Sequence, residues 1–234
     1  MLLAGLFAVP AWGAPPADMA ERLAACGACH GEHGEGAGGG EYVPHLSGKP
    51  AGYLREQLQA FRDGRRRYAQ MTWLVRNMDD AWLERIAAFY AGLPPILARQ
   101  RGDSRQSAAL DARARQLVEH GDAALGVPAC SACHGANLAG LEPGVPALVG
   151  LPADYVVAQL GAWRTGVRNS VEPDCMEAVA LALSASDLRA LGNWLAARGN
   201  DEQARPAAAG SLAAPMHCGS IPGSERVPGA GSAP

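Results

Sequence analysis

Four of the six cysteines lie in two clusters of identical spacing, each followed directly by a histidine. The clusters read Cys-Gly-Ala-Cys-His at 26–30 and Cys-Ser-Ala-Cys-His at 130–134. Two thiols in this spacing, with an adjacent histidine, are the attachment signature of a c-type haem. The thiols add to the haem vinyl groups and the histidine binds the iron, so we predict two covalently attached haem c groups. The residues assigned to them are Cys26, Cys29, Cys130, Cys133, His30 and His134.

Two other chemistries use paired cysteines. A zinc site made from two C-x-x-C pairs is the main rival, but it leaves the two following histidines unexplained. A thioredoxin-like redox motif needs a βαβ context, and no segment alternates well enough to predict a strand. The haem interpretation accounts for all six residues.

Each haem iron needs a sixth ligand or keeps an open position, and this choice separates electron transfer from ligand chemistry. Met71 follows His30 by 41 residues and Met176 follows His134 by 42, in what we expect to be a loop before the last helix of each unit. Methionine usually fills gaps in a core. The matched positions instead favour Met71 and Met176 as axial ligands, and His/Met ligation raises the reduction potential.

The chain repeats itself over much more than the cysteine motifs. Ten residues between Pro44 and Arg66 recur 102 positions later, with only Phe61 changed in type, to Trp163. After a small length change the match continues from Met71 to Met176 at an offset of 105. A period this long indicates a duplicated domain, because solenoid repeats are about 20–50 residues long.

Hydrophobic spacing predicts that both units are helical. Apolar residues recur at helical spacing from Tyr53 to Phe61 and from Tyr155 to Trp163. Asp79 and Ser184 are expected to cap the last helix of each unit. Gly92 and the two prolines that follow Leu93 should end that helix in the first unit.

The chain has 234 residues and a net charge of −3. A protein that binds nucleic acid is usually basic, so this charge does not support nucleic-acid binding. The uncharged start resembles a signal peptide without a basic end, so we expect export, with an uncleaved membrane anchor as the alternative. The predicted divisions are a signal peptide at 1–13, a first haem domain at 14–98, a linker at 99–110, a second haem domain at 111–200 and a flexible tail at 201–234.

The sequence resembles the cytochrome c4 family of di-haem class I c-type cytochromes, over about residues 18–200. The resemblance rests on both haem motifs, on Pro-x-Leu-x-Gly at 44–48 and 146–150, on the duplicated runs at 53–66 and 155–168, and on the two methionines. It implies an all-α fold of two tandem class I cytochrome c domains, each wrapped around one covalent haem. It also implies that Arg66 and Arg168 lie near haem propionates or the domain interface, whereas a solvated position is the plain alternative.

The resemblance implies a periplasmic carrier of single electrons, with transient partners: a quinol-oxidising complex or dehydrogenase as donor, and a terminal oxidase or reductase as acceptor. Two alternatives are a haem enzyme of the thiosulfate-oxidising or peroxidase type, and a cytochrome subunit of a larger membrane complex. Only Cys175, beside Met176, favours an enzyme. We expect Cys175 to be a buried thiol, although it could also ligate iron or pair with Cys218 of the Met216–Cys218 cluster. The loop histidines His33 and His45 are expected to face solvent.

Overall fold

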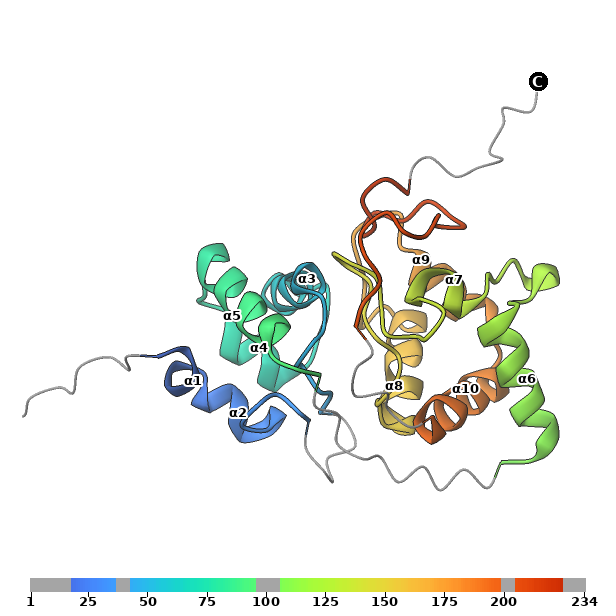
Figure 1. Cartoon of the computed structure of the whole chain (residues 1–234), viewed down its shortest axis with the longest axis horizontal. Helices are drawn as coiled ribbons and strands as arrows, with labels where there is room; N and C mark the ends of the chain where they lie inside the picture. The colour runs from blue at the N-terminus through green and yellow to red at the C-terminus, as the bar shows by residue number, and fades with distance from the viewer. Residues whose placement is uncertain (1–17, 37–42, 96–105, 199–204, 225–234) are drawn as a thin grey trace, which may run out of the picture.

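The structure is a computed structural model, and it describes residues 18–36, 43–95, 106–198 and 205–224. These residues form two helical halves that lie side by side (Figure 1). Within these ranges there are helices and isolated β-bridges but no strands, as the sequence predicts. No helix in the described ranges has the length and hydropathy needed to cross a membrane. The predicted signal peptide, the end of the predicted tail and most of the predicted linker lie outside the described residues.

The first half is built from five helices. They are α1 (Met19–Arg22), α2 (Ala24–His30), α3 (Ala51–Arg62), α4 (Ala69–Val75) and α5 (Asp80–Gly92). As predicted, Asp79 caps α5 by accepting a hydrogen bond from the backbone of Trp82, and α5 ends at Gly92. Its inner face buries Leu83, Ile86, Ala87 and Tyr90. These side chains form one core with Leu54 and Phe61 from α3.

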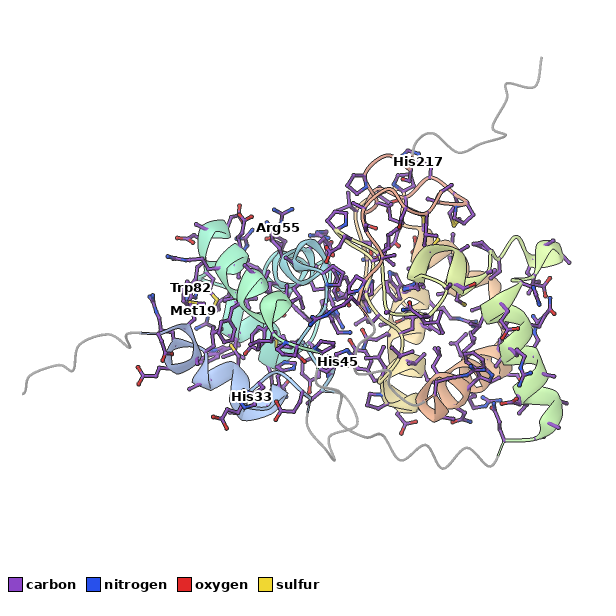
Figure 2. All side chains as sticks on the ribbon, viewed as in Figure 1. Met19, His33, His45, Arg55, Trp82 and His217 are labelled. Atoms are coloured by element: carbon purple, nitrogen blue, oxygen red, sulfur yellow. A yellow bond between two sulfur atoms is a disulfide. The ribbon has the colours of Figure 1, made fainter. Side chains whose placement is uncertain are left out.

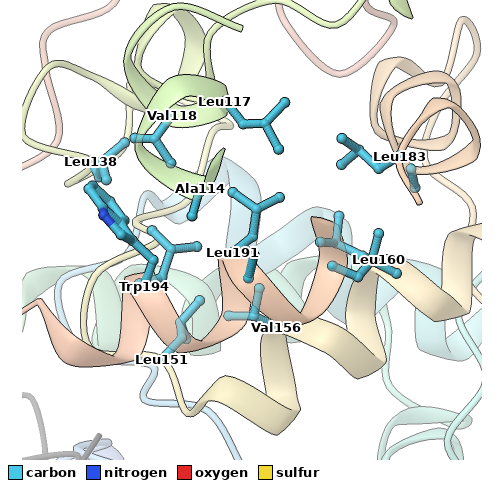
Figure 3. Close-up of a cluster of buried hydrophobic side chains, with 14 of the residues drawn as sticks. Ala114, Leu117, Val118, Leu138, Leu151, Val156, Leu160, Leu183, Leu191 and Trp194 are labelled. Carbon is cyan, nitrogen blue, oxygen red and sulfur yellow. The ribbon is translucent and has the colours of Figure 1, made fainter. Parts of the chain in front are cut away.

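The second half repeats this plan with additions. Its helices are α6 (Ala108–Glu119), the 3₁₀ turn η1 (Ala123–Leu125), α7 (Cys130–His134), α8 (Ala153–Arg164), α9 (Cys175–Ala182) and α10 (Ala185–Ala197). Helix α6 starts inside the range predicted as linker, because Ser107 caps it. Leu117 from α6 and Leu191 from α10 share one core with Leu160 from α8 (Figure 3).

The two halves meet through their repeat-matched segments. Arg66 and Arg168 form an antiparallel β-bridge. The backbone N–H of Arg67 donates to Val167 O at 2.9 Å, and that of Asn169 donates to Arg65 O at 2.7 Å. Equivalent segments of the duplication therefore pair with each other, which gives the interface an approximate twofold symmetry.

The described part of the C-terminal segment, residues 205–224, lies against the second half (Figure 1). Ala207 forms a β-bridge with Leu141, and Gly219 N–H donates to Pro173 O at 3.0 Å. Cys218 is 2% exposed. These residues are joined to the second half by backbone hydrogen bonds and by the disulfide described below, while the flexibility of the tail stays a prediction.

Candidate haem sites

Both cysteine motifs lie on a short helix whose last residue is the histidine. The glycine after each histidine, Gly31 and Gly135, has a φ of 84° and 85°, a conformation that suits glycine and turns the chain sharply. In both halves the helix therefore presents two thiols and a buried imidazole within one to two turns. This is the predicted arrangement for covalent haem attachment.

A repeated hydrogen bond orients each histidine. Nδ1 of His30 lies 2.9 Å from the carbonyl oxygen of Pro44, and Nδ1 of His134 lies 2.8 Å from that of Pro146. A carbonyl oxygen only accepts, so Nδ1 carries the hydrogen. This fixes the tautomer in which Nε2 has a free lone pair, as is usual for histidines that bind metals.

Burial also keeps both imidazoles neutral. It lowers the pKa of His30 below its ordinary value, and it lowers the pKa of His134 to about 4. The neutral imidazole is the form that binds a metal ion. Both halves thus offer a ligand in the correct charge state at neutral pH.

The four motif cysteines are free thiols in the structure. Burial raises the pKa of Cys26 and Cys133, and it raises that of Cys130 to about 11. These three thiols remain protonated at neutral pH, and neither motif pair has closed into a disulfide. They are available for thioether formation.

The two predicted methionine ligands lie within helices, so their assignment to a loop is wrong. Met71 is the third residue of α4, and Met176 is the second residue of α9. Asp174 caps α9 by accepting from the backbone N–H of Met176 at 3.1 Å, and it also accepts from Trp163 Nε1 at 3.1 Å. The turn that carries Met176 is therefore anchored to α8.

The predicted haem-binding residues of the second half line a cavity of about 190 Å³. Its walls include both motif cysteines, the histidine and the methionine, namely Cys130, Cys133, His134 and Met176. The rest of the lining is mostly apolar, with side chains such as Leu160, Leu191 and Leu195. A soft thioether, a neutral imidazole and two free thiols around an apolar space fit a covalently bound haem. In the first half, Met71 and Cys26 pack against one hydrophobic core.

Cys175 is not a free thiol, because it forms a disulfide with Cys218. The preferred expectation of a buried thiol is therefore wrong, and the alternative pairing with the tail is the one observed. The bond joins the residue before Met176 to the C-terminal segment, and Met216, Ser220 and Ile221 of that segment also line the cavity. His217, which is exposed, lies on the outer side of this segment (Figure 2).

The two repeat-matched arginines are buried at the domain interface. Arg66 donates to Gln57 at 2.9 Å within its own half, and to Tyr155 at 3.1 Å and Gln159 at 2.6 Å across the interface. Arg168 makes the symmetry-related contacts, with Gln159 and with Tyr53 and Gln57. The alternative of solvated arginines is wrong, because each guanidinium replaces water with amide and phenol oxygens of both halves.

Two residues of the interface were not expected there. His45 is 3% exposed and lies toward the second half (Figure 2), where burial lowers its pKa well below the ordinary value. Its predicted solvent-facing position is wrong. Lys49, the only lysine of the chain, is 4% exposed and lines the cavity of the second half. Its alignment with the apolar Leu151 was a signal of burial that sequence reasoning missed.

Comparisons with known proteins agree with this arrangement. The cytochrome c family model matches residues 19–89. The thiosulfate dehydrogenase electron acceptor of Thiomonas intermedia is 36% identical over 198 residues, which are 84% of this chain and 88% of the relative. The cytochrome c4 of Pseudomonas aeruginosa is 33% identical over 176 residues, with 74% of this chain and 84% of the relative covered.

A solved structure shows the same architecture. The crystal structure of reduced recombinant cytochrome c4 from Pseudomonas stutzeri matches with a TM-score of 0.64 and 31% identity, over 75% of this chain and 94% of the solved chain. The fold and the two motifs define a c-type cytochrome with two class I domains and covalently bound haem c. The chain belongs to the cytochrome c4 family, and it is a di-haem electron carrier of that type.

Proposed function

We propose that the chain carries single electrons through two haems with histidine and methionine axial ligands. The ligand pairs are His30 with Met71, and His134 with Met176; the attachment residues are Cys26, Cys29, Cys130 and Cys133. One observation carries this proposal: each half fixes its histidine through Nδ1 to a repeat-matched proline carbonyl. The duplication has thus preserved the orientation of a metal ligand as well as the motif.

The protein groups have simple tasks in such a carrier. A bound haem supplies an iron that changes oxidation state by one electron. The proline carbonyls hold the imidazoles, the cap at Asp174 holds the turn of Met176, and apolar side chains such as Leu160 and Leu191 exclude water from the cavity. Rigid ligands and a dry surrounding keep the iron site unchanged between oxidation states, which is what fast electron transfer needs.

The disulfide bears on the choice between carrier and enzyme. Cys175 was the only residue that favoured catalysis at an iron, and it is bonded to Cys218. With Cys175 bonded, the thiols that line the cavity with Met176 are Cys130 and Cys133, which we assign to haem attachment. The carrier assignment requires both iron sites to be closed by methionine.

For the partner, we infer a thiosulfate-oxidising dehydrogenase as electron donor, and a terminal oxidase or reductase as acceptor. The relative from Thiomonas intermedia supports this donor, since its name describes an electron acceptor of thiosulfate dehydrogenase. Two irons that each take one electron suit a donor that releases electrons in pairs. The periplasm is the compartment we propose, because c-type haem motifs and a disulfide occur together and the disulfide needs oxidising surroundings.

The first test is an optical spectrum of the ferric and ferrous holoprotein, with and without carbon monoxide. We expect a methionine-to-iron charge-transfer band for two haems per chain and no spectral change with carbon monoxide. Carbon monoxide binding by one haem would reveal an iron without a sixth protein ligand. That result would favour the alternative of a haem enzyme.

The second test addresses the donor. The ferric holoprotein is mixed with a thiosulfate dehydrogenase and thiosulfate in a stopped-flow instrument, and haem reduction is followed. We expect both haems to be reduced, with a rate that depends on the dehydrogenase concentration. Thiosulfate alone serves as the control. Equal reduction without the dehydrogenase would favour direct thiosulfate chemistry, and no reduction in either case would reject this donor.

A further inference from the structure

Lys49 enters the second half from the first. It lies two residues before the start of α3 of the first half, yet it lines the cavity that contains Cys130, Cys133 and His134. Its side chain is almost completely buried, with 4% exposure. One half of the molecule thus contributes a cation to the haem cavity of the other.

The ammonium of Lys49 has no counter-charge. No ion pair or side-chain hydrogen bond joins it to another described residue, and the charges that act on it most strongly are the guanidiniums of Arg168 and Arg66. Burial, and then these two cations, lower its pKa to about 7. A buried unpaired charge is costly and normally signals a partner.

Arg168 shows the same deficit at the same cavity. It is 5% exposed and lines the cavity, and its Nε has no hydrogen-bond partner. Burial, followed by the charge of Arg66, lowers its pKa. Two buried cations from different halves, both lining one cavity and both incompletely paired, form a site for an anion.

The carboxylates that line this cavity are already engaged. Glu56 forms an ion pair with Arg65 at 2.6 Å. Asp174 accepts from Trp163 and from the cap of α9. The missing anion must therefore arrive with a ligand. A haem attached at Cys130 and Cys133 brings two propionate carboxylates into this same cavity, so it supplies the chemistry that the cations lack.

We propose that Lys49 of the first half, together with Arg168 of the second, binds a propionate of the haem attached at Cys130 and Cys133, and that the lysine raises the reduction potential of this haem above that of the other. A nearby positive charge stabilises the ferrous state, which carries one positive charge less than the ferric state, and it does so strongly in a dry site. The repeat-matched position holds Leu151, which carries no charge. Lys49 therefore acts as a positioning residue for one haem and makes the two haems unequal. The proposal rests on haem attachment in the second half, as proposed above.

The test is a redox titration of the holoprotein at constant pH, resolved into two one-electron components. Lys49→Met removes the charge at similar side-chain length. For one component, we expect the ratio of reduced to oxidised haem at a given applied potential to fall at least tenfold, which equals a 59 mV drop in its midpoint potential for one electron. For the other component, this ratio should change less than threefold. Lys49→Arg restores the charge and should stay within threefold of the wild type. Arg55→Met, which removes an exposed charge from α3, should leave both components unchanged.

Equal shifts of both components, or no shift, would overturn the proposal. Resonance Raman spectra provide a second readout, because the propionate bending mode should change in Lys49→Met and return in Lys49→Arg. If the methionine variant fails to fold, Lys49→Gln supplies the neutral side chain. A wild-type potential that falls with added phosphate, but not in Lys49→Met, would show a free anion instead of the propionate and would also overturn the assignment.

The haem count separates this proposal from the one on which it depends. A pyridine haemochrome assay should give two haems per chain for every variant. One haem per wild-type chain would mean that attachment at Cys130 and Cys133 fails. Two haems with unchanged potentials in Lys49→Met would mean that only the lysine assignment fails.

Discussion

The two halves of the molecule share their ligand geometry but differ in how the site is enclosed. In both, a buried histidine donates to a proline carbonyl, at 2.9 Å for His30 and 2.8 Å for His134. Among the described residues, a disulfide-linked segment lies against the cavity of the second half, and Lys49 from the neighbouring half lines the same cavity. Duplication has thus kept the geometry of the two proposed iron-binding histidines and varied the residues around the proposed haem sites. The surroundings tune a reduction potential as strongly as the ligands do.

The largest expected effect comes from removing one of the two proposed methionine ligands at a time. Met71→Ala and Met176→Ala should each abolish half of the methionine-to-iron charge-transfer band and allow one haem to bind carbon monoxide. The loss follows because alanine offers no sixth ligand. Met78→Ala is the matched control, since Met78 aligns with Leu183 and should leave the band intact. An undiminished band in either ligand variant would reject that methionine as a ligand.

The disulfide should stabilise the second half alone. It closes a sequence separation of 43 residues, and loss of such a link costs about 2–4 kcal/mol of unfolding free energy, chiefly through the unfolded state. We expect Cys218→Ser to lower the stability of the second half by this amount. Hydrogen exchange of α5 should stay as in the wild type, whereas exchange of α10 should accelerate. Equal acceleration in both helices would mean that the link supports the whole molecule.

A close contact at the interface gives a smaller asymmetric effect. A Cβ added at Gly52 would lie 2.5 Å from the carbonyl oxygen of Pro143, so the backbone at one of these two positions must shift. Gly52→Ala should therefore lower the free energy of unfolding by about 1–3 kcal/mol, the usual cost of overpacking. The matched position is Asp154, which is exposed, and Asp154→Ala should change stability by less than about 0.5 kcal/mol. Urea unfolding measures both, and equal changes would contradict the interface packing.

The smallest effect distinguishes the caps of the last helices. Ser184 forms a reciprocal capping box with Asp187, whereas Asp79 makes a single bond to Trp82. Removing a cap costs about 1 kcal/mol, and Ser184→Ala should cost more than Asp79→Ala because two bonds are lost. Guanidinium unfolding of both variants gives the order. A larger loss in Asp79→Ala would show that the capping box contributes little.

Local and repeated features could be predicted from the sequence. The helical spacing of Tyr53 and Gln57, the caps at Asp79 and Ser184, and the end of α5 at Gly92 all depend on neighbours within a few residues, and the structure confirms them. The duplication supported each prediction twice. The ligand assignment of Met71 and Met176 stays a prediction, although the cavity around Met176 supports it.

Long-range features could not be read in the same way. The pairing of Cys175 with Cys218 joins a helix start to an irregular segment, and no spacing rule identifies such a pair. The burial of His45 and Lys49 results from packing between the halves, and a repeat says nothing about which residues face its own copy. Met71 and Met176 were placed in loops because helices this short give too little periodic signal.

The disulfide has a consequence for how the protein is made. In chain order the second half presents Cys130, Cys133, Cys175 and then Cys218. When the chain is exported with its N-terminus first, three thiols of this half therefore appear before Cys218. In oxidising surroundings each of them competes for Cys218 through thiol exchange. Thioethers do not exchange, so the proposed haem attachment at Cys130 and Cys133 would remove two competitors and leave Cys175 as the remaining partner within this half. We therefore expect a preferred order of maturation, with haem loading first and closure of the C-terminal segment last.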